Sequence, residues 1–370
     1  MTTEAATAEG AATRDTHIER GYRTSIVDAV VAALERLPGP SWLAYLGLAG
    51  LSVGYIALEG LAGNFPWTAD SLGRLGYAFF FVYPLAAYHY LSSGARQAWD
   101  DFRPATDLGG AAAERMRLEL STTPFRPVAV IFALVAVVNV VSYAAFPTEL
   151  DLAGRPITHI ALRAVSESLW VAPMAIVLIY LVFRQLRLVA RLHSSVRRVD
   201  LLRPGPMHAL SQLTSRSAIA LVVFAVYSGI PLPGITEPAW IGTLVAFVAP
   251  MLLLALAAFF VPLRGLNRLL LREKGRMLDE VGLRIHAAAE ALHRTVDVEA
   301  ANEDDHERSR ASQTRVDALN KALTSLFQER DVIRRLSTWP WDGGTVRAVA
   351  SAVALPIVLF LITRVLDRFI

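Results

Sequence analysis

The chain has 370 residues, 54% of them hydrophobic, and a mean hydropathy of +0.41, which is high for a soluble protein. It contains no cysteine, which excludes disulfides and thiolate metal sites. The formal net charge is only +3, but the basic residues are strongly segregated along the chain, and this segregation is the useful signal.

The amino-terminal segment has two parts. Residues 1–24 are small, polar and partly acidic, without the charged-then-apolar order of a signal peptide, so we expect a disordered tail. Residues 25–37 place apolar side chains on one helical face, and Ser25 with Asp28 matches a capping box. The pattern predicts a short amphipathic helix that either lies on the membrane surface or packs on other cytoplasmic helices.

Seven segments are apolar enough to cross a bilayer as helices, each near the roughly 20 residues that this requires. They are residues 42–62, 74–93, 127–146, 163–183, 217–235, 240–262 and 346–366. Arginine is concentrated in the connections after the second, fourth and sixth segments, so the positive-inside rule places the amino terminus in the cytoplasm and the carboxyl terminus outside. The predicted fold class is an all-α polytopic membrane protein with seven transmembrane helices, the first six within 41–262.

Two cytoplasmic connections are predicted to continue as helices. Residues 184–216 are rich in arginine without interleaved aromatic residues, which favours anchoring near anionic lipid over binding of nucleic acid. Residues 263–336 carry two apolar stripes, and the second has heptad-like spacing: Val316, Leu319, Leu323, Leu326 and Ile333. Two interpretations fit these stripes, an intramolecular hairpin that projects roughly 50 Å and an interface between subunits.

The segment 337–344, "STWPWDGG", joins this region to the last helix, 345–370. Trp339 and Trp341 flank Pro340 where the chain re-enters the membrane, and amphipathic rings favour the headgroup layer. Proline cannot continue a helix, and the glycine pair permits a sharp turn. We therefore expect an interfacial hinge with two ring anchors; ligand stacking by the tryptophans is the alternative.

Polar side chains within the spans are candidate ligand-binding residues, because charges are costly in a bilayer. They are Glu59, Asn139, Arg163 and Glu167. Arg163 and Glu167 are four residues apart and can pair on one helical face, so a structural ion pair is the alternative to an outward-facing ligand site.

Catalytic motifs are few. The one GxSxG match, Gly50–Gly54, lies inside an apolar span, where Gly47, Gly50 and Gly54 predict a close-packing face instead. The sequence contains no HExxH, Walker A or dinucleotide-binding motif. We expect no enzymatic activity, no cofactor and no metal.

Four stretches resemble an uncharacterised family of prokaryotic multi-span membrane proteins: "RLHSSVRRVDLLRPGPMHALSQLTSRSAIAL", "VPLRGLNRLLLREK", "DALNKAL" and "LSTWPWDGGTVRAVASAVALPIVLFLI". The resemblance covers about the last half of the chain and implies a prokaryotic plasma-membrane protein, with no established activity. The expected architecture is also similar to that of the insect odorant and gustatory receptors. Those are tetrameric ligand-gated cation channels, with an anchor of cytoplasmic helices and a pore lined by the last helix. Their short sequence signature is not evident here, so no residue role is carried over.

The leading hypothesis is a homo-oligomeric, tetrameric ligand-gated ion channel or chemoreceptor-like protein that binds an unknown small ligand. Its pore would be lined by one mostly apolar face of the last helix, which favours a dewetting constriction: Ser351, Leu355, Val358 and Ile362. The alternatives are a membrane signalling or scaffold protein that acts through its cytoplasmic helices, and a transporter.

Overall fold

The computed structural model describes residues 22–61, 78–145, 157–195, 201, 205–228, 242, 246, 248–300, 306–339, 341 and 343–366. Within these residues the chain is helical apart from turns, short links and one isolated bridge between Thr24 and Pro124, so the predicted all-α class is confirmed for them. The helices before the middle of the chain are α2 (Ile26–Glu35), α3 (Ser41–Leu61), α5 (Ala78–Phe102), η1 (Arg103–Ala105), α6 (Gly110–Ser121) and α7 (Phe125–Ala145). Those that follow are α8 (Ile157–Ser166), η2 (Glu167–Val171), α9 (Ala172–Ser195), α10 (Gly205–Ser228), α12 (Ala249–Ala300), α13 (His306–Arg335) and α14 (Gly343–Leu366).

Five of the described helical segments are long and apolar enough to cross a membrane: Ser41–Leu58, Phe125–Ala145, Ala164–Leu192, Gly205–Val226 and Ala249–Asp297. They overlap five of the seven predicted spans. The predicted span 74–93 begins in residues outside the described set and continues into α5. The predicted span 346–366 corresponds to α14, which, like α5, is not among the five. The described residues therefore contain several apolar helices suited to a membrane. That the chain has seven transmembrane helices stays a prediction.

The spans differ in how much protein surrounds them. In α10, 72% of the span is buried inside the protein, compared with 6% in α3 and 11% in α7. The first core cluster joins α2, α5, α9, α10 and α12, and its most buried members include Leu85, Leu178, Leu181, Leu221 and Ala255. A central α10 is therefore packed by protein, whereas α3 and α7 present their apolar surfaces outward, as a lipid environment requires.

The small-residue face of α3 has no packing partner in the described chain. A Cβ added at Gly47, Gly50 or Gly54 would meet nothing within 4 Å. The close-packing face predicted there is therefore not packed by any described helix of the same chain.

The amino-terminal helix packs against the bundle. Ser25 caps α2, and its hydroxyl and the Asp28 carboxylate form both halves of the predicted capping box. Val27 and Val31 are buried in the first core cluster, whereas Ile26 is exposed. Within the described residues this helix thus packs on neighbouring helices, which is one of the two arrangements expected for residues 25–37.

A π-helical turn interrupts the predicted fourth span. The turn η2 occupies Glu167–Val171, between α8 and α9. Pro173 follows in the first turn of α9, and it has no N–H to donate to the carbonyl four residues earlier, within η2. The widened turn accommodates this missing hydrogen bond.

The cytoplasmic extension predicted at 184–216 consists of parts of two helices. The end of α9 continues the span to Ser195, and α10 already begins at Gly205, with Pro206 in its first turn, where the missing N–H costs nothing. The predicted fifth span, 217–235, is thus the second half of a longer helix. Residues 229–235 lie outside the described set.

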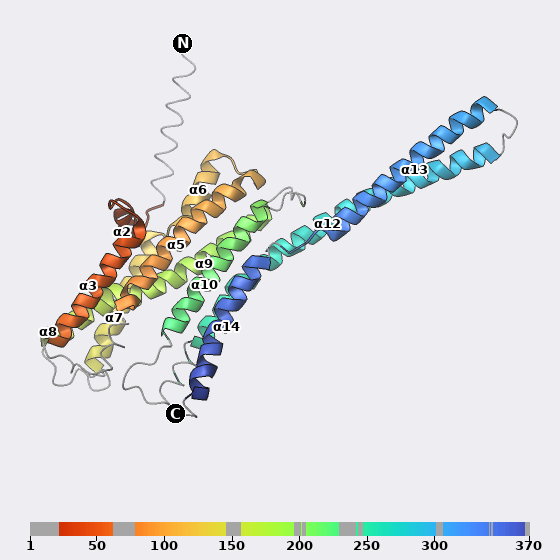
Figure 1. The fold of residues 1–370 in the computed structure, drawn as a ribbon. Helices are drawn as coiled ribbons and strands as arrows, with labels where there is room; N and C mark the ends of the chain where they lie inside the picture. The colour runs from red at the N-terminus through yellow and green to blue at the C-terminus, as the bar shows by residue number, and fades with distance from the viewer. Residues whose placement is uncertain are drawn as a thin grey trace, which may run out of the picture.

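The second extension is the most distinctive part of the molecule. Helix α12 runs unbroken for 52 residues through Pro262, and α13 folds back along its outer half (Figure 1). From Leu263 to Ala300, α12 covers about 55 Å. The base of the hairpin is fixed by Lys274, whose Nζ donates to the carbonyls of Arg334 and Leu336, each at 2.8 Å. This ammonium satisfies carbonyls at the end of α13 and complements the helix dipole there. We call α13 and residues 274–300 of α12 the arm. Within the described residues its two helices run antiparallel, which is the arrangement of the intramolecular hairpin.

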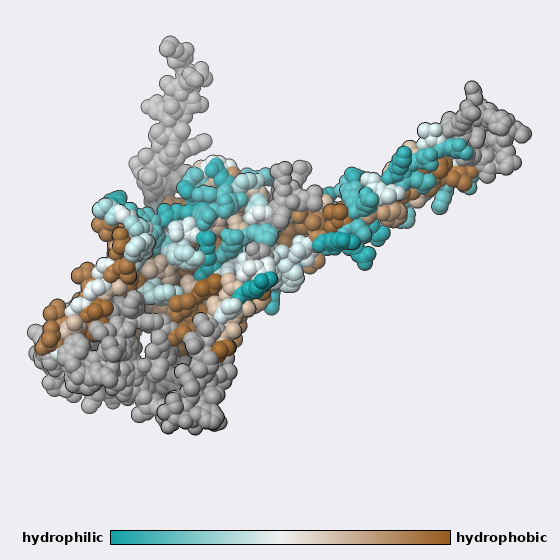
Figure 2. Space-filling view, in the orientation of Figure 1, coloured by the Kyte–Doolittle hydropathy of each residue, from teal (hydrophilic) through white to brown (hydrophobic). Residues whose placement is uncertain are grey.

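The two ends of the bundle differ in polarity. Helices α2 and α6 and the arm lie toward one end, and α14 ends toward the other (Figure 1). Hydrophobic surface gathers over α3 and the lower part of the bundle, whereas hydrophilic surface covers the end that carries α6 and most of the arm (Figure 2). This division is the one expected for a bundle whose lower part is embedded in lipid.

Candidate functional site

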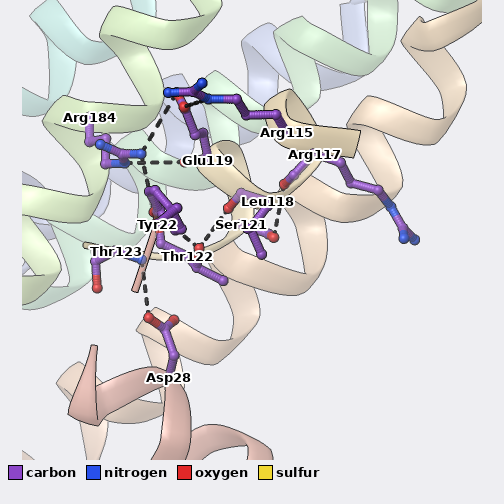
Figure 3. A network of polar contacts seen from close by, with 10 residues as sticks. All are labelled: Tyr22, Asp28, Arg115, Arg117, Leu118, Glu119, Ser121, Thr122, Thr123 and Arg184. Carbon is purple, nitrogen blue, oxygen red and sulfur yellow. Dashed lines mark hydrogen bonds and ion pairs between the residues drawn. The ribbon is translucent and has the colours of Figure 1, made fainter. Parts of the chain in front are cut away.

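The chain segment before α2 is attached to the link between α6 and α7 by backbone hydrogen bonds. The amide of Ser25 donates to the carbonyl of Thr123 at 3.0 Å, and the amide of Phe125 donates to the carbonyl of Arg23 at 2.8 Å. This short antiparallel pairing joins segments that lie about a hundred residues apart in the sequence. It brings polar side chains of both segments together, as Figure 3 shows for Tyr22, Asp28 and Thr123.

Asp28 is the centre of the resulting polar cluster. Its Oδ2 accepts hydrogen bonds from the Ser25 amide (3.0 Å), the Ser25 hydroxyl (2.8 Å) and the Thr123 amide (3.2 Å). Its Oδ1 accepts from the hydroxyl of Tyr88, a fully buried residue of α5, at 2.7 Å. One carboxylate therefore connects α2, α5 and the α6–α7 link. We call Ser25, Asp28, Tyr88 and Thr123 the Asp28 clamp.

Arg184 of α9 extends the cluster on its other side (Figure 3). Its Nε donates to the Glu119 carbonyl and its Nη2 to the Tyr22 hydroxyl, both at 3.2 Å. Its guanidinium carbon lies 5.6 Å from the centre of the Tyr22 ring. Burial raises the pKa of Tyr22, so the phenol stays neutral and can also donate to the Thr122 carbonyl at 3.1 Å. These contacts hold α9 against α6 and the amino-terminal segment.

Gln185, the next residue of α9, is completely buried. Its Nε2 donates to the carbonyls of Leu91 in α5 (3.3 Å) and Leu120 in α6 (3.1 Å). An amide that satisfies carbonyls of two other helices fixes their relative position, because leaving those groups unpaired in the interior is costly.

A second polar chain connects α2, α3 and α5. His89 is bonded at both ring nitrogens: Nε2 lies 2.9 Å from Glu35 Oε1, and Nδ1 lies 2.8 Å from the Tyr45 hydroxyl. The same Glu35 oxygen accepts from Arg96 Nη2 at 2.8 Å, and this hydrogen bond lowers the pKa of the Glu35 carboxyl. The histidine is therefore satisfied at the interface between α2, α3 and α5.

A cavity of about 370 Å³ opens between α2, α5 and α6, beside both polar chains. Asp28, Glu35 and Arg96 line it, and all three are already paired within the protein. The buried hydroxyl of Ser92, which also lines the cavity, has no hydrogen-bond partner among the described residues. Asp28 is held by hydroxyls and backbone amides, and Glu35 and Arg96 pair with each other, so this arrangement functions as a structural clamp. No group of three or more metal-ligating side chains occurs within the described part of the chain.

Of the four predicted ligand residues, the structure describes the side chain of one, Asn139. Asn139 of α7 donates from Nδ2 to the hydroxyl of Ser168, in the π-helical turn, at 3.1 Å. The side chains of Glu59, Arg163 and Glu167 lie outside the described set, so the predicted Arg163–Glu167 pair stays a prediction.

The two tryptophans of the predicted hinge stack on each other and on α12. The rings of Trp339 and Trp341 lie 4.4 Å apart, and Trp341 lies 5.4 Å from Phe259. Trp339 is 46% exposed, whereas Trp341 is half-buried. Trp341 therefore packs on protein, and Trp339 is the ring that is available to an interface. Pro340 lies outside the described residues.

The other predicted residues fall on α13 and α14. Of the heptad-like stripe on α13, Ile333 is buried, whereas the remaining four are half-buried: Val316, Leu319, Leu323 and Leu326. On α14, Ser351 and Val358 are exposed, and the side chains of Leu355 and Ile362 lie outside the described set.

The clamp residues were not predicted as a site. The capping-box pattern identified Ser25 and Asp28, but it is a local signal and does not reveal Tyr88 or Thr123 as partners. The sequence identifies Arg184 only as one residue of the arginine-rich segment 184–216.

No protein-family model, no curated protein and no solved structure matches this chain. The resemblance to an uncharacterised prokaryotic family, and the architectural similarity to insect receptors, stay predictions.

Proposed function

We propose that this chain is a membrane scaffold or signalling protein whose arm assembles copies of the chain into a homo-oligomer. The observation that carries the proposal is the incomplete burial of the arm's apolar residues. Val281 and Ile333, near the base, are buried, but Leu319, Leu323 and Leu326 remain half-buried between α12 and α13. Two paired helices bury only the side chains along the line where they meet. A further helix is needed to cover the apolar surface that stays exposed on the arm.

The outer faces of the arm support the same proposal. Leu283 of α12 is 72% exposed, and Phe327 and Val332 of α13 are 51% and 55% exposed. The antiparallel pairing that brings Lys274 to the end of α13 places Leu283 and Phe327 at a similar level along the arm. Burying such a side chain stabilises a complex by about 1.5–3 kcal/mol, so a second arm that covers several of them supplies a substantial driving force. Because α12 is continuous from the membrane span into the arm, contacts on the arm act directly on that span.

The arm is assigned to the cytoplasm on the segregation of arginine. The chain lacks cysteine, so single cysteines introduced at positions 302 and 370 report on sidedness without background labelling. A membrane-impermeant maleimide applied to intact cells is expected to label position 370 and to leave position 302 unlabelled. Labelling of position 302 from outside would overturn the orientation.

Assembly is tested by mass measurement of the purified chain in lipid nanodiscs or detergent. The parent is expected to be oligomeric, and Phe327→Glu is expected to shift it toward the monomer, because a charge enters the buried contact. Gln328→Glu adds the same charge at an exposed neighbouring position and is expected to leave the mass unchanged. Unchanged far-UV circular dichroism in Phe327→Glu shows that the hairpin itself is intact. A parent that is monomeric at micromolar concentration contradicts the proposal.

A second candidate function is the channel of the leading sequence hypothesis, and one feature of α14 favours it. Val349 is buried in the cluster that α14 shares with α10 and α12, and Ser351 and Val358 lie on another face, which is exposed. In an oligomer this free face is available to line an axis, where its apolar residues would form a dewetting constriction. Ion flux into liposomes is expected for the parent and is expected to rise in Val358→Ser. Absence of flux from both would remove the channel and leave the scaffold proposal standing.

A further inference from the structure

A groove of about 660 Å³ runs between α9 and α12, with Glu119 of α6 at one edge. Its hollow arises from small side chains, Ala190, Ala257 and Ala258, set between bulkier neighbours such as Phe183 and Leu254. Both helices belong to membrane-spanning candidates, so the groove opens along the side of the bundle at the level where lipids lie.

One end of the groove is apolar and the other end is strongly basic. Phe183, Leu254 and Val261 line the apolar part. Arg184, Arg187 and Arg191 follow at three- and four-residue steps on α9, so they share one helical face at the end where the apolar run gives way to charge. That level corresponds to the lipid headgroups.

The charges in the groove are unbalanced. Glu119 is the only acidic side chain among the described residues that line it, and the Glu119 carboxylate already accepts a hydrogen bond from Arg115 Nε at 2.9 Å. Arg184 is held by the Glu119 carbonyl and by Tyr22. Arg187 is exposed and makes no hydrogen bond or ion pair with the described residues. Arg187 therefore retains its positive charge at the basic end, toward the membrane surface.

From this combination we propose that the groove is a binding site for one anionic phospholipid. The headgroup phosphate lies between Arg187 and Arg191, and an acyl chain runs along Phe183, Ala257 and Val261. Basic pockets between spanning helices recognise anionic headgroups in this way. A zwitterionic lipid brings no net charge to match the arginines, and a free phosphate ion leaves the apolar part empty. The inference requires only that these helices are embedded in a membrane, and it does not depend on the oligomeric state or on ion conduction.

The test is native mass spectrometry of the detergent-purified chain titrated with phosphatidylglycerol or phosphatidylcholine. The parent is expected to retain phosphatidylglycerol about tenfold more tightly, and the Arg187→Gln/Arg191→Gln variant is expected to lose most of that preference. Arg187→Lys/Arg191→Lys keeps the charge and is expected to keep most of the binding. Arg264→Gln/Arg268→Gln removes the same charge from α12 outside the groove and is expected to bind within about twofold of the parent.

Two further measurements distinguish binding of a lipid from binding of a free anion. Ala257→Trp fills the apolar part and is expected to weaken phosphatidylglycerol binding with the arginines intact, whereas millimolar inorganic phosphate is expected not to displace the lipid. Displacement by phosphate, or full binding in Ala257→Trp, would show a simple anion site. Equal retention of both lipids by the parent, or equal losses in the groove and control variants, would overturn the proposal.

Discussion

Replacing Asp28 with alanine is expected to lower the free energy of unfolding by about 2–4 kcal/mol, although the residue lies on a short helix near the chain terminus. The four hydrogen bonds that Asp28 accepts do not contribute equally. The Ser25 amide keeps the Thr123 carbonyl as an acceptor, and the Tyr88 hydroxyl keeps the Thr123 hydroxyl, 2.8 Å away. The Thr123 amide has no second acceptor in the clamp and is left unsatisfied.

Two losses set the magnitude. The Thr123 amide becomes a buried donor without a partner, which costs about 1–3 kcal/mol, and α2 loses the Asp28 half of its capping box, which costs about 1 kcal/mol, while the Ser25 hydroxyl still accepts from the amide of residue 28. Asp28→Asn keeps one acceptor oxygen and is expected to cost about half as much. In a cycle with Tyr88→Phe, the coupling energy is expected to be about 1 kcal/mol or more, because the two groups are in direct contact at 2.7 Å.

The assay is thermal unfolding in lipid nanodiscs, followed by tryptophan fluorescence at one scan rate so that irreversible unfolding affects all variants alike. The apparent unfolding temperature is expected to fall by roughly 5–10 °C in Asp28→Ala. Asp101→Ala is the control, because Asp101 is an exposed acid of the same bundle end without a hydrogen bond or ion pair to the described residues. If the two variants unfold within a degree of each other, the Asp28 clamp does not hold the amino-terminal helix in place.

Three other measurements examine separate contacts. The hydrogen bond from Arg96 lowers the pKa of Glu35. The ionised carboxylate therefore stabilises the fold fully above the ordinary pKa of 4.5, and this stabilisation is lost as the pH falls through the lowered pKa. The difference in unfolding temperature between the parent and Glu35→Gln should therefore shrink below pH 4.5. Gly94→Ala places a Cβ 2.7 Å from Arg216 Nη1, but the flexible guanidinium can move away. Alanine also favours the helix by about 1 kcal/mol relative to glycine. The free energy of unfolding of this variant should therefore stay within about 1 kcal/mol of that of the parent. Trp341→Ala should lower the free energy of unfolding by about 2 kcal/mol and Trp339→Ala by less than half of that, because only Trp341 packs on Phe259. Equal losses of stability would favour the predicted hinge in which both rings act as membrane anchors.

Local patterns in the sequence determined much of the fold. Capping residues and apolar runs act on neighbouring residues, so the capping box at Ser25 could be predicted without knowing what packs nearby. The two helices of the arm were predictable for the same reason, but their apolar spacing fitted both an intramolecular hairpin and an interface between subunits, and only the structure shows α13 folded back on α12. The spacing did not show that the apolar side chains of the arm are only partly buried, which is the observation behind the proposed assembly.

Only the tertiary structure decided which polar residues meet. Asp28 and Tyr88 are 60 residues apart, and Tyr22 and Arg184 are 162 residues apart, so no local pattern connects them. The same holds for the groove, whose arginines lie on α9 and whose hollow depends on alanines of α12. The arginine run alone predicted attraction to anionic lipid in general. A defined binding site requires a second surface beside it, and that surface comes from the packing of distant helices.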